Sequence, residues 1–367
     1  MMADKEILPE EECALEHIAV IIPSYEPDER LVVLIQDLQK LCQNIVVVND
    51  GSNSRFDGIF RELENRGVTV LRHAVNQGKG RALKTAFNYC LLQDQELIGC
   101  VTADSDGQHL PEDIIRCGQT LQQNPGDLVL GCRNFDDDSV PQKSRYGNKI
   151  TRTIFRYLCG LKITDTQTGL RGIPAKFMRE LLSVPGERFE FETNMLIAAK
   201  DGYSIREIEI KTVYDSKTNH QTHFDPLKDS IRIYRILGRI FLSFIISSLS
   251  ASIIDLSLFA IFCALLREKA GYILLATALA RIISATYNYL VNYHIVFSSK
   301  EQHCKSTVKY IVLAIVQGTM SAILVNALVL LVGARFELLA KIVVDTLLFV
   351  LSFYIQREFV FQKKGKN

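Results

Sequence analysis

Two carboxylates and an amide follow an apolar run in the stretch LIGCVTADSDGQHLPED (97–113). Asp104 and Asp106 are separated by a single residue, and Gln108 lies just beyond them. Oxygen donors of this kind suit a hard cation such as Mg²⁺, which usually takes few protein ligands and completes its shell with water and substrate phosphates. A single Asp-x-Asp is more often a polar turn that caps the next helix, so other chemistry-bearing residues must gather beside this pair to indicate a site.

Basic residues that can neutralise phosphates occur in two further places. The stretch NQGKGRA (76–82) carries Lys79 and Arg81 at the start of an expected helix, where unpaired N–H groups also favour anions. Arg133 ends another apolar run, and its guanidinium can contact a phosphate through two N–H groups. A divalent cation and basic side chains around a diphosphate would stabilise a nucleotide leaving group. Neither the P-loop pattern nor the G-x-G-x-x-G pattern of dinucleotide folds occurs in the sequence.

The elements that must position these residues are buried strands alternating with helices. Apolar, β-rich runs recur at 18–25, 44–50, 68–73, 97–104 and 127–133, and the stretches between them show helical spacing. Strands that are apolar on both faces and alternate with helices predict a mostly parallel sheet covered on both sides. In such a sheet, ligands bind beyond the carboxyl ends of the strands. The polar residues at these ends are Pro23, Ser24, Tyr25 and Glu26; Asn49, Asp50, Gly51 and Ser52; Asp104, Ser105 and Asp106; and Arg133.

Five motifs, in their order and spacing, resemble family 2 glycosyltransferases of the GT-A fold: IIPSYEP, VVNDGS, NQGKGRAL, ADSDGQH and DTQTGLRG. The branch that they resemble most is the dolichol- or polyprenyl-phosphate sugar transferases, and the resemblance covers about residues 17–225. It implies an α/β catalytic domain that uses a nucleotide diphospho-sugar with Mg²⁺ or Mn²⁺. Asn49 departs from the family, whose members often have a second Asp there, so the identity of the nucleotide base stays open.

The resemblance also assigns roles to particular residues. The nucleoside pocket would be lined by Pro23, Tyr25, Glu26 and Asp50. The metal ion would be held against the diphosphate by Asp104, Asp106 and Gln108. Phosphates would be contacted, or the contacting loop positioned, by Lys79, Arg133 and Arg171. The candidate catalytic residues are Asp104, Asp106, Arg133 and Glu192.

The acceptor is expected to be a phosphate. Transfer to a hydroxyl needs a general base, whereas a phosphate monoester is already an anion at pH 7. The stretch ERFEFETN (187–194) supplies Glu190 and Glu192 but not the Glu-Asp pair typical of hydroxyl-acceptor members, and a chain without tryptophan cannot carry the Q-x-x-R-W of processive synthases. Either glutamate orients the sugar or is an ordinary carboxylate at a helix start. In the polar loop 214–226, Lys217 and His220 either grip the acceptor phosphate or belong to a mobile loop.

The last third of the chain is strongly apolar. An amphipathic stretch with a cationic line that includes Arg232 and Arg235 is expected to lie at a membrane interface, where these arginines could also hold the acceptor phosphate. Four spans follow at about 240–266, 270–297, 308–332 and 338–361, and each exceeds the roughly 20 residues needed to cross a bilayer. The ends of the second and fourth spans, NYLVNYHIVF and SFYIQREFVF, are alike and indicate an internal duplication. Together with ARIISATYNYLVNYHIVF, they resemble the GtrA-like membrane family, which is associated with moving or organising polyprenyl-linked sugars.

Charged residues indicate the orientation of this membrane part. Lysines and arginines gather in the bridge before the first span, in the 298–309 loop and in the C-terminal tail, so the positive-inside rule places both termini and the catalytic domain in the cytosol. The polar, acidic start of the chain agrees, since it lacks a signal-peptide pattern. Asp255, Arg281 and Asp345 lie inside spans, where charges are costly. They either pair to hold helices together or line a route for a lipid phosphate.

The expected organisation is a tail (1–17), a GT-A domain (18–225), an amphipathic interface helix (226–240) and a GtrA-like domain with four transmembrane helices (241–367). The expected function is inverting transfer of a sugar from a nucleotide diphospho-sugar, a UDP-sugar ahead of GDP-mannose, to polyprenyl phosphate at the cytosolic face. A flippase or organiser of the lipid-linked sugar, a combined synthase and flippase, and a transferase that is merely anchored are the alternatives. Nine scattered cysteines indicate reduced thiols, no nucleic-acid partner is expected, and homo-oligomerisation is left open.

Overall fold

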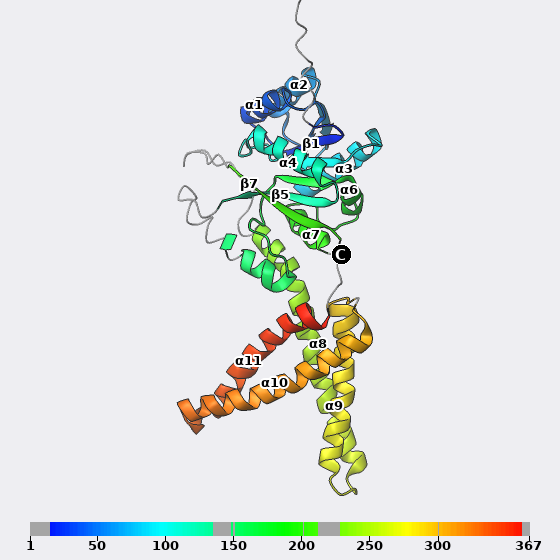
Figure 1. Cartoon of the computed structure of the whole chain (residues 1–367), viewed down its shortest axis with the longest axis vertical. Coiled ribbons are helices and arrows are strands. Elements are labelled where there is room, and N and C mark those ends of the chain that lie inside the picture. The colour runs from blue at the N-terminus through cyan, green and yellow to red at the C-terminus, as the bar shows by residue number, and fades with distance from the viewer. Residues whose placement is uncertain are drawn as a thin grey trace, which may run out of the picture. The chain divides into compact units, whose positions relative to one another are not determined.

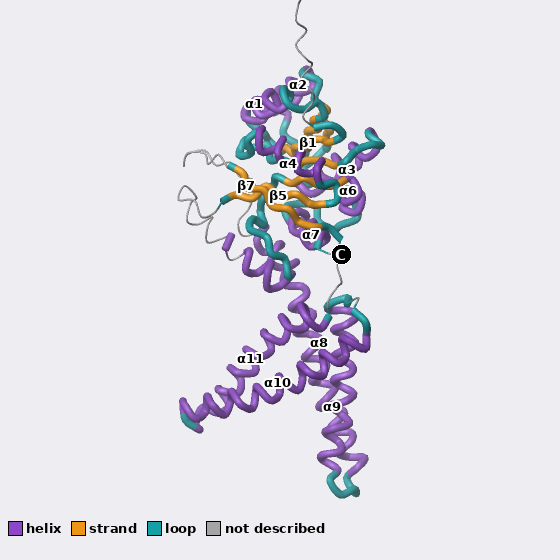
Figure 2. The backbone as a smooth tube through the Cα atoms, in the orientation of Figure 1, coloured by secondary structure: helices purple, strands orange, loops and turns teal. Residues whose placement is uncertain are grey.

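The computed structural model describes residues 15–134, 148–149, 151–200, 202–211, 228–299 and 301–361. The chain divides into two compact units. The first consists of residues 1–156 and 161–233, and the second of residues 157–160 and 234–367. The helices and strands of both units are shown in Figures 1 and 2.

The first unit is built on a seven-stranded sheet with the strand order β3-β2-β1-β4-β6-β5-β7. The strands are β1 (Ile18–Ser24), β2 (Ile45–Asn49), β3 (Thr69–Arg72), β4 (Gly99–Thr102), β5 (Asp127–Arg133), β6 (Arg171–Pro174) and β7 (Ser204–Ile210). All neighbouring strands run parallel except for β6, which is antiparallel to β4 and β5. The predicted α/β fold with a mostly parallel sheet is therefore confirmed, and β6 is an addition that the pattern of apolar runs did not reveal.

Helices cover both faces of this sheet (Figure 1). On one face, α1 (Glu29–Leu38), α2 (Asp57–Asn65) and α4 (Pro111–Gln123) bury side chains such as Leu31, Leu63 and Ile114 against Val20 and Val47. The other face is packed by α3 (Lys79–Gln93) and α6 (Ala175–Leu181), and α7 (Glu190–Ala199) lies against α3. This double cover explains why β1, β2 and β4 are buried along their whole length. The short η1 (Ser54–Phe56) belongs to this unit, whereas the boundary between the two units falls within the π-helical turn η2 (Phe155–Cys159).

The second unit contains four helices that are long and apolar enough to cross a membrane. They belong to α8 (Lys228–Leu266), α9 (Tyr272–Val291) with the π-helical turn η3 (Asn292–Val296), α10 (His303–Val332), and α11 (Glu337–Ile355) with the π-helical turn η5 (Gln356–Val360). The short η4 (Ala334–Phe336) connects α10 and α11. The stretch predicted as a separate interface helix is continuous with the first span, since α8 runs unbroken from Lys228.

The ends of the two helical hairpins meet through equivalent residues, as the internal duplication predicts. Asn292 and Gln356 each begin a π-helical turn, and Nδ2 of Asn292 donates to Oε1 of Gln356 at 3.1 Å. Phe297 and Phe361 stack at 5.3 Å between centroids. Phe361 also contacts Tyr289 at 5.7 Å, and the reciprocal contact of Phe297 with Phe353 measures 5.8 Å. Reciprocal contacts of this kind are typical of two similar halves related by a two-fold axis.

Each hairpin is also cross-linked by a polar cluster within its spans. In the first hairpin, Asp255 on α8 pairs with Arg281 on α9 at 3.2 Å and accepts a hydrogen bond from Ser284 at 2.7 Å. The second hairpin holds Asp345 on α11, which accepts a hydrogen bond from Ser321 on α10 at 2.6 Å. The structure thus contains the helix-holding pair that was one of the two roles foreseen for these charges.

Candidate active site

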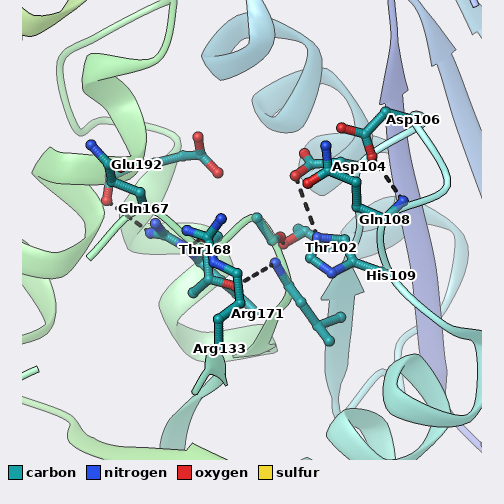
Figure 3. Close-up of polar contacts among 12 residues, drawn as sticks. Thr102, Asp104, Asp106, Gln108, His109, Arg133, Gln167, Thr168, Arg171 and Glu192 are labelled. Carbon is teal, nitrogen blue, oxygen red and sulfur yellow. Dashed lines mark hydrogen bonds and ion pairs between the residues drawn. The ribbon is translucent and has the colours of Figure 1, made fainter. Parts of the chain in front are cut away.

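The carboxylate pair lies at the carboxyl end of β4, as expected from its place in the sequence (Figure 3). The loop after Gln167 passes directly beside it, because Thr102 Oγ1 donates to the Gly169 carbonyl at 2.8 Å. Gly169 lies so close to Asp104 that a Cβ there would stand 2.2 Å from Oδ2 of the carboxylate. Only a residue without a side chain fits between this loop and Asp104.

The Asp104 carboxylate contacts Lys79 and His109. Its Oδ1 accepts from Lys79 Nζ at 2.7 Å, and its Oδ2 lies 3.4 Å from His109 Nε2. Burial raises the pKa of Asp104, but the charge of Lys79 and the hydrogen bond from His109 outweigh it, so the pKa lies well below its usual value. Asp104 therefore stays ionised at any physiological pH.

Lys79 is the first residue of α3 and connects two parts of the site. Besides Asp104 it contacts Glu192 Oε1 at 2.9 Å, and Glu192 lies in the first turn of α7. Burial lowers the pKa of Lys79, yet the two carboxylates raise it above its ordinary value. Glu190, the other glutamate considered for orienting the sugar, instead holds the turn before α7, since it accepts from the backbone N–H groups of Glu187 and Arg188.

Asp106 has a different environment from Asp104. Its Oδ1 accepts from the backbone N–H of Gln108 at 3.1 Å. Burial and the negative charge of Asp104 raise the pKa of Asp106. Two neighbouring carboxylates thus differ: one is neutralised by Lys79, and the other lies in an excess of negative charge.

The oxygen atoms available to a divalent cation are those of Asp106 and Gln108, with Asp104 and its contact to His109 beside them (Figure 3). Asp104 is also engaged by Lys79. Within the described residues, no group of three His, Cys, Asp or Glu side chains gathers as a closed metal site. A hard cation that takes one or two protein carboxylates and otherwise binds water and phosphate oxygens fits these residues. The excess negative charge at Asp106 would be relieved by such a cation.

The two candidate arginines are both held by the segment DTQTGLRG (165–172). Arg133, at the end of β5, donates to both oxygens of the fully buried Asp165 at 2.7 and 3.1 Å. Arg171, at the start of β6, is almost completely buried and donates to the carbonyls of Thr168 and Glu192 at 2.9 and 2.8 Å. Arg171 thus ties the turn at Thr168 to α7, which is a positioning contact, while contact of either arginine with a phosphate stays a prediction.

The residues expected around the nucleoside lie at the ends of β1 and β2. Pro23 is in β1, the backbone N–H of Glu26 donates to Ser52 Oγ at 2.8 Å, and Tyr25 is half-buried between them in sequence. Asp50 is buried and accepts from the backbone N–H groups before α3. Their contact with a nucleoside stays a prediction.

The expectation of unpaired N–H groups at the start of α3 was wrong for several of them. Asp50 accepts from Gln77 and Gly78, and the N–H of Arg81 donates to the Glu187 carbonyl at 2.9 Å. The Arg81 guanidinium pairs with Glu187 at 2.6 Å. The anion at this helix start is thus the Asp50 carboxylate of the chain itself. Because Arg81 pairs with Glu187, Lys79 is the basic residue of this motif that contacts Asp104 among the described contacts.

The predicted acceptor residues are only partly visible. Lys217 and His220 lie outside the described residues. The backbone of Arg232 belongs to α8, and Arg235 is exposed on the same helix. Conversely, the structure adds His109, Asp165 and His73 to the site region, which sequence reasoning missed. The signal for His73 was its position directly after β3, next to the ends of β2 and β1 in the sheet.

Comparison with known proteins adds a second line of support. Residues 19–182 match the sequence model of Glycosyl transferase family 2, and residues 243–361 match that of GtrA/DPMS, transmembrane domain. An uncharacterized protein of Methanocaldococcus jannaschii is 31% identical over 205 residues, which cover 54% of this chain and 82% of that protein. The UDP-N-acetylglucosamine--dolichyl-phosphate N-acetylglucosaminyltransferase of Methanococcus voltae is 30% identical, covering 54% and 86%. The undecaprenyl-phosphate 4-deoxy-4-formamido-L-arabinose transferase of Pectobacterium atrosepticum is 26% identical, covering 61% and 67%.

A sheet with charged residues at its strand ends, joined in one chain to four helices able to span a membrane, defines the class as a membrane-bound glycosyltransferase. The chain belongs to glycosyl transferase family 2, and its C-terminal part is a GtrA/DPMS transmembrane domain. The named relatives use dolichyl or undecaprenyl phosphate as acceptors. The predictions of enzyme class and of a GtrA-like membrane domain are confirmed.

Proposed function

We propose that the protein transfers a sugar from a nucleotide diphospho-sugar to polyprenyl phosphate at the cytosolic face of a membrane, with inversion at the anomeric carbon. The observation that supports this most directly is the Lys79 ammonium held between Asp104 and Glu192, next to the unneutralised Asp106. These residues carry net negative charge, so they would bind a divalent cation, and the cation would in turn bind the diphosphate. The relative from Methanococcus voltae, named for a UDP-sugar donor and a dolichyl-phosphate acceptor, supports a UDP-sugar as the first donor to test.

The reaction requires one displacement. An oxygen of the acceptor phosphate forms a bond to the anomeric carbon, and the bond between that carbon and the nucleotide diphosphate breaks, which yields a polyprenyl-phospho-sugar and a nucleoside diphosphate. The acceptor is already ionised at pH 7, so no side chain has to remove a proton. Lys79 orients Asp104 and Glu192, whose oxygens would hold sugar hydroxyls. Arg133, whose guanidinium is oriented by Asp165, would contact a phosphate of the donor.

Mg²⁺ or Mn²⁺ would be held by Asp106 and Gln108, with Asp104 as the neighbouring carboxylate. When bound, it would supply positive charge to the leaving diphosphate. The acceptor phosphate would be gripped by Lys217, His220, Arg232 and Arg235, because the lipid phosphate lies at the level of the membrane surface. The four spanning helices and the distribution of lysine and arginine support cytosolic termini.

The decisive experiment uses the full chain in nanodiscs with Mg²⁺ or Mn²⁺, undecaprenyl or dolichyl phosphate, and a panel of UDP- and GDP-sugars. The expected product is a polyprenyl-phospho-sugar formed with stoichiometric release of nucleoside diphosphate. Transfer to a water-soluble hydroxyl acceptor, with none to the lipid phosphate, would contradict the proposed acceptor.

A second activity is supported by one observation in the membrane domain. Arg281 pairs with Asp255 at 3.2 Å, yet 70% of its side chain stays exposed within a spanning helix, more than the pair needs, where charged side chains usually meet a partner or line a polar path. Movement of the lipid-linked sugar across the bilayer is the alternative that this favours. Liposomes loaded with preformed product separate the two activities: transport that needs Arg281 but not Asp104 would identify the membrane domain as a flippase.

A further inference from the structure

Three polar side chains, those of Asp50, His73 and Thr85, form a hydrogen-bonded line beside the start of α3. His73, the residue after β3, contacts Asp50 Oδ1 through Nδ1 at 2.7 Å and Thr85 Oγ1 through Nε2 at 2.9 Å. The side chains of His73 and Asp50 are 7% and 4% exposed. This line therefore connects the ends of β2 and β3 to the second turn of α3, and its His73 and Asp50 side chains are largely shielded from solvent.

The Asp50 carboxylate also fixes the turn that precedes α3. Its Oδ1 accepts from the N–H of Gln77 at 2.9 Å, and its Oδ2 accepts from the N–H of Gly78 at 2.7 Å. The helix itself has no side-chain cap in its first residues, so a carboxylate from a different strand takes that place. Gly51 packs against the same loop, since a Cβ there would lie 2.1 Å from the Val75 carbonyl carbon. The turn is thus held through its N–H groups and through close backbone packing.

This turn determines the position of Lys79. Lys79 directly follows Gly78, and its ammonium reaches Asp104 at 2.7 Å and Glu192 at 2.9 Å. Gly78 has a φ of +103°, which only glycine adopts without strain, so the direction in which α3 starts depends on this one peptide. A shift of about 1 Å in such a group costs an enzyme on the order of a hundredfold in rate.

We propose that His73 is a positioning residue for the transfer reaction: it orients the Asp50 carboxylate, which holds the Gln77–Gly78 turn and thereby places Lys79 against Asp104 and Glu192. Because an ionised carboxylate only accepts hydrogen bonds, Nδ1 of His73 carries the hydrogen, and Thr85 completes the other ring nitrogen. The effect on catalysis rests on the proposed function of Lys79, whereas the effect on the turn does not.

Two substitutions separate the ring nitrogens. In His73→Asn the amide nitrogen takes the place of Nδ1, so the bond to Asp50 is kept and the bond to Thr85 is lost. In His73→Gln the amide nitrogen lies near the place of Nε2, so the bond to Thr85 is kept and the bond to Asp50 is lost. We expect kcat to fall about tenfold or more in His73→Gln, with KM for the lipid acceptor unchanged, and to stay within about threefold of wild type in His73→Asn.

The control is Leu63→Ala, which removes a fully buried side chain of α2 from the core. It destabilises the fold without changing Asp50, His73 or Thr85. If His73 mattered only for stability, the two His73 variants would lose activity in proportion to their loss of Tm, as Leu63→Ala does, or the Asn and Gln variants would behave alike. Either result overturns the proposal.

A readout without turnover keeps this proposal separate from the proposed function. Amide hydrogen exchange of the full chain in nanodiscs is measured for the peptide that contains Gln77 and Gly78. Exchange at these two amides is expected to increase at least about tenfold in His73→Gln and in Asp50→Asn, and to stay near wild type in His73→Asn and Leu63→Ala. Unchanged exchange in both Asp50→Asn and His73→Gln overturns the inference. Increased exchange in a protein that transfers no sugar leaves the inference intact and refutes the proposed function.

Discussion

Lys79 and Glu192 form an ion pair of 2.9 Å, although each belongs to the first turn of a different helix. A carboxylate is favourable at a helix start, but an ammonium there opposes the helix dipole. Lys79 is therefore in an unfavourable place for the stability of α3, and the neighbouring carboxylates are what keep it there. The position is better explained by the chemistry of the site than by the stability of the helix.

Lys79→Gln should abolish most of the activity while the protein stays folded. The substitution removes the cation that separates Asp104, Asp106 and Glu192, so the carboxylates repel one another and the site loses a contact to the leaving group. We expect kcat to fall by about 10² to 10³. Steady-state release of nucleoside diphosphate measures this. Lys40→Gln, at an exposed position whose ammonium pairs only with Asp37 among the described residues, is the control and should keep wild-type turnover.

Gly169→Ala should inactivate the enzyme through Asp104. The added methyl would need space now taken by the Asp104 carboxylate, so the carboxylate must move away from Lys79. Turnover is expected to fall at least about a hundredfold. Gly58→Ala, in α2 with open space around it, is the matched control: it should keep full activity and add up to about 1 kcal/mol of stability. Equal activity of the two variants would contradict the placement of Gly169.

Asp106→Asn should stabilise the protein while removing its activity. Burial and the charge of Asp104 raise the pKa of Asp106 above its ordinary value of 3.8, so the folded protein binds this proton more tightly than the unfolded chain does. Ionised Asp106 therefore costs stability, and the cost disappears as the pH falls through the folded pKa towards 3.8. Thermal unfolding of both proteins between pH 4 and 8 should show a higher Tm for the variant at pH 8, with the difference shrinking at low pH. A difference that grows on acidification would be incompatible with this account.

Thiol labelling should report both the core and the membrane orientation. Burial raises the pKa of Cys90 and of Cys132 to about 12, so neither forms appreciable thiolate at pH 8 and both should stay unmodified until the protein unfolds. Cys304 is exposed near the start of α10, and Cys263 lies near the end of α8. In sealed vesicles of a Cys13→Ser background, an impermeant maleimide should reach Cys304 from the cytosolic side only. Labelling of Cys304 from the opposite side would reverse the proposed topology.

The polar cross-link of the second hairpin should show a measurable coupling. Ser321→Ala removes the donor and Asp345→Ala removes the acceptor of a 2.6 Å hydrogen bond between α10 and α11. A double-mutant cycle on unfolding in bilayers should give a coupling energy of about 0.6 kcal/mol, and at most about 1.7 kcal/mol, since polar contacts between membrane helices are modest. Additive effects would show that the two groups do not stabilise each other in the membrane.

Much of the fold and of the site could be read from local sequence patterns. Runs of apolar residues identified five strands, and the rule that ligands bind at strand ends brought Asp50, Asp104 and Arg133 to one edge. Four spans were visible from their length alone. The strand β6 was missed because its sequence RGIP holds a charged residue, a glycine and a proline and so shows no apolar run, and pairing with β4 and β5 makes it a strand.

The contacts that give the site its charge balance were not predictable. Whether Glu190 or Glu192 faces Lys79 depends on how residues 187–191 pack against Gly78 and Gly80, which lie far away in the sequence. Likewise, the capture of the α3 N–H groups by Asp50 depends on the close packing of Gly51 against Val75. Such contacts follow from tertiary packing of distant segments, and local residue types do not determine them.

The reciprocal contacts at the ends of the two hairpins bear on how this membrane domain arose. An ancestral gene for a single hairpin could have produced the same bundle as a homodimer, with Asn292 and Gln356 descending from one position that met its own copy. The polar cross-links of the two hairpins differ: the acid comes from the first helix in one hairpin (Asp255) and from the second helix in the other (Asp345). In this view, the difference arose after the two halves were fused. Two such halves are no longer interchangeable, and each is free to evolve a separate task.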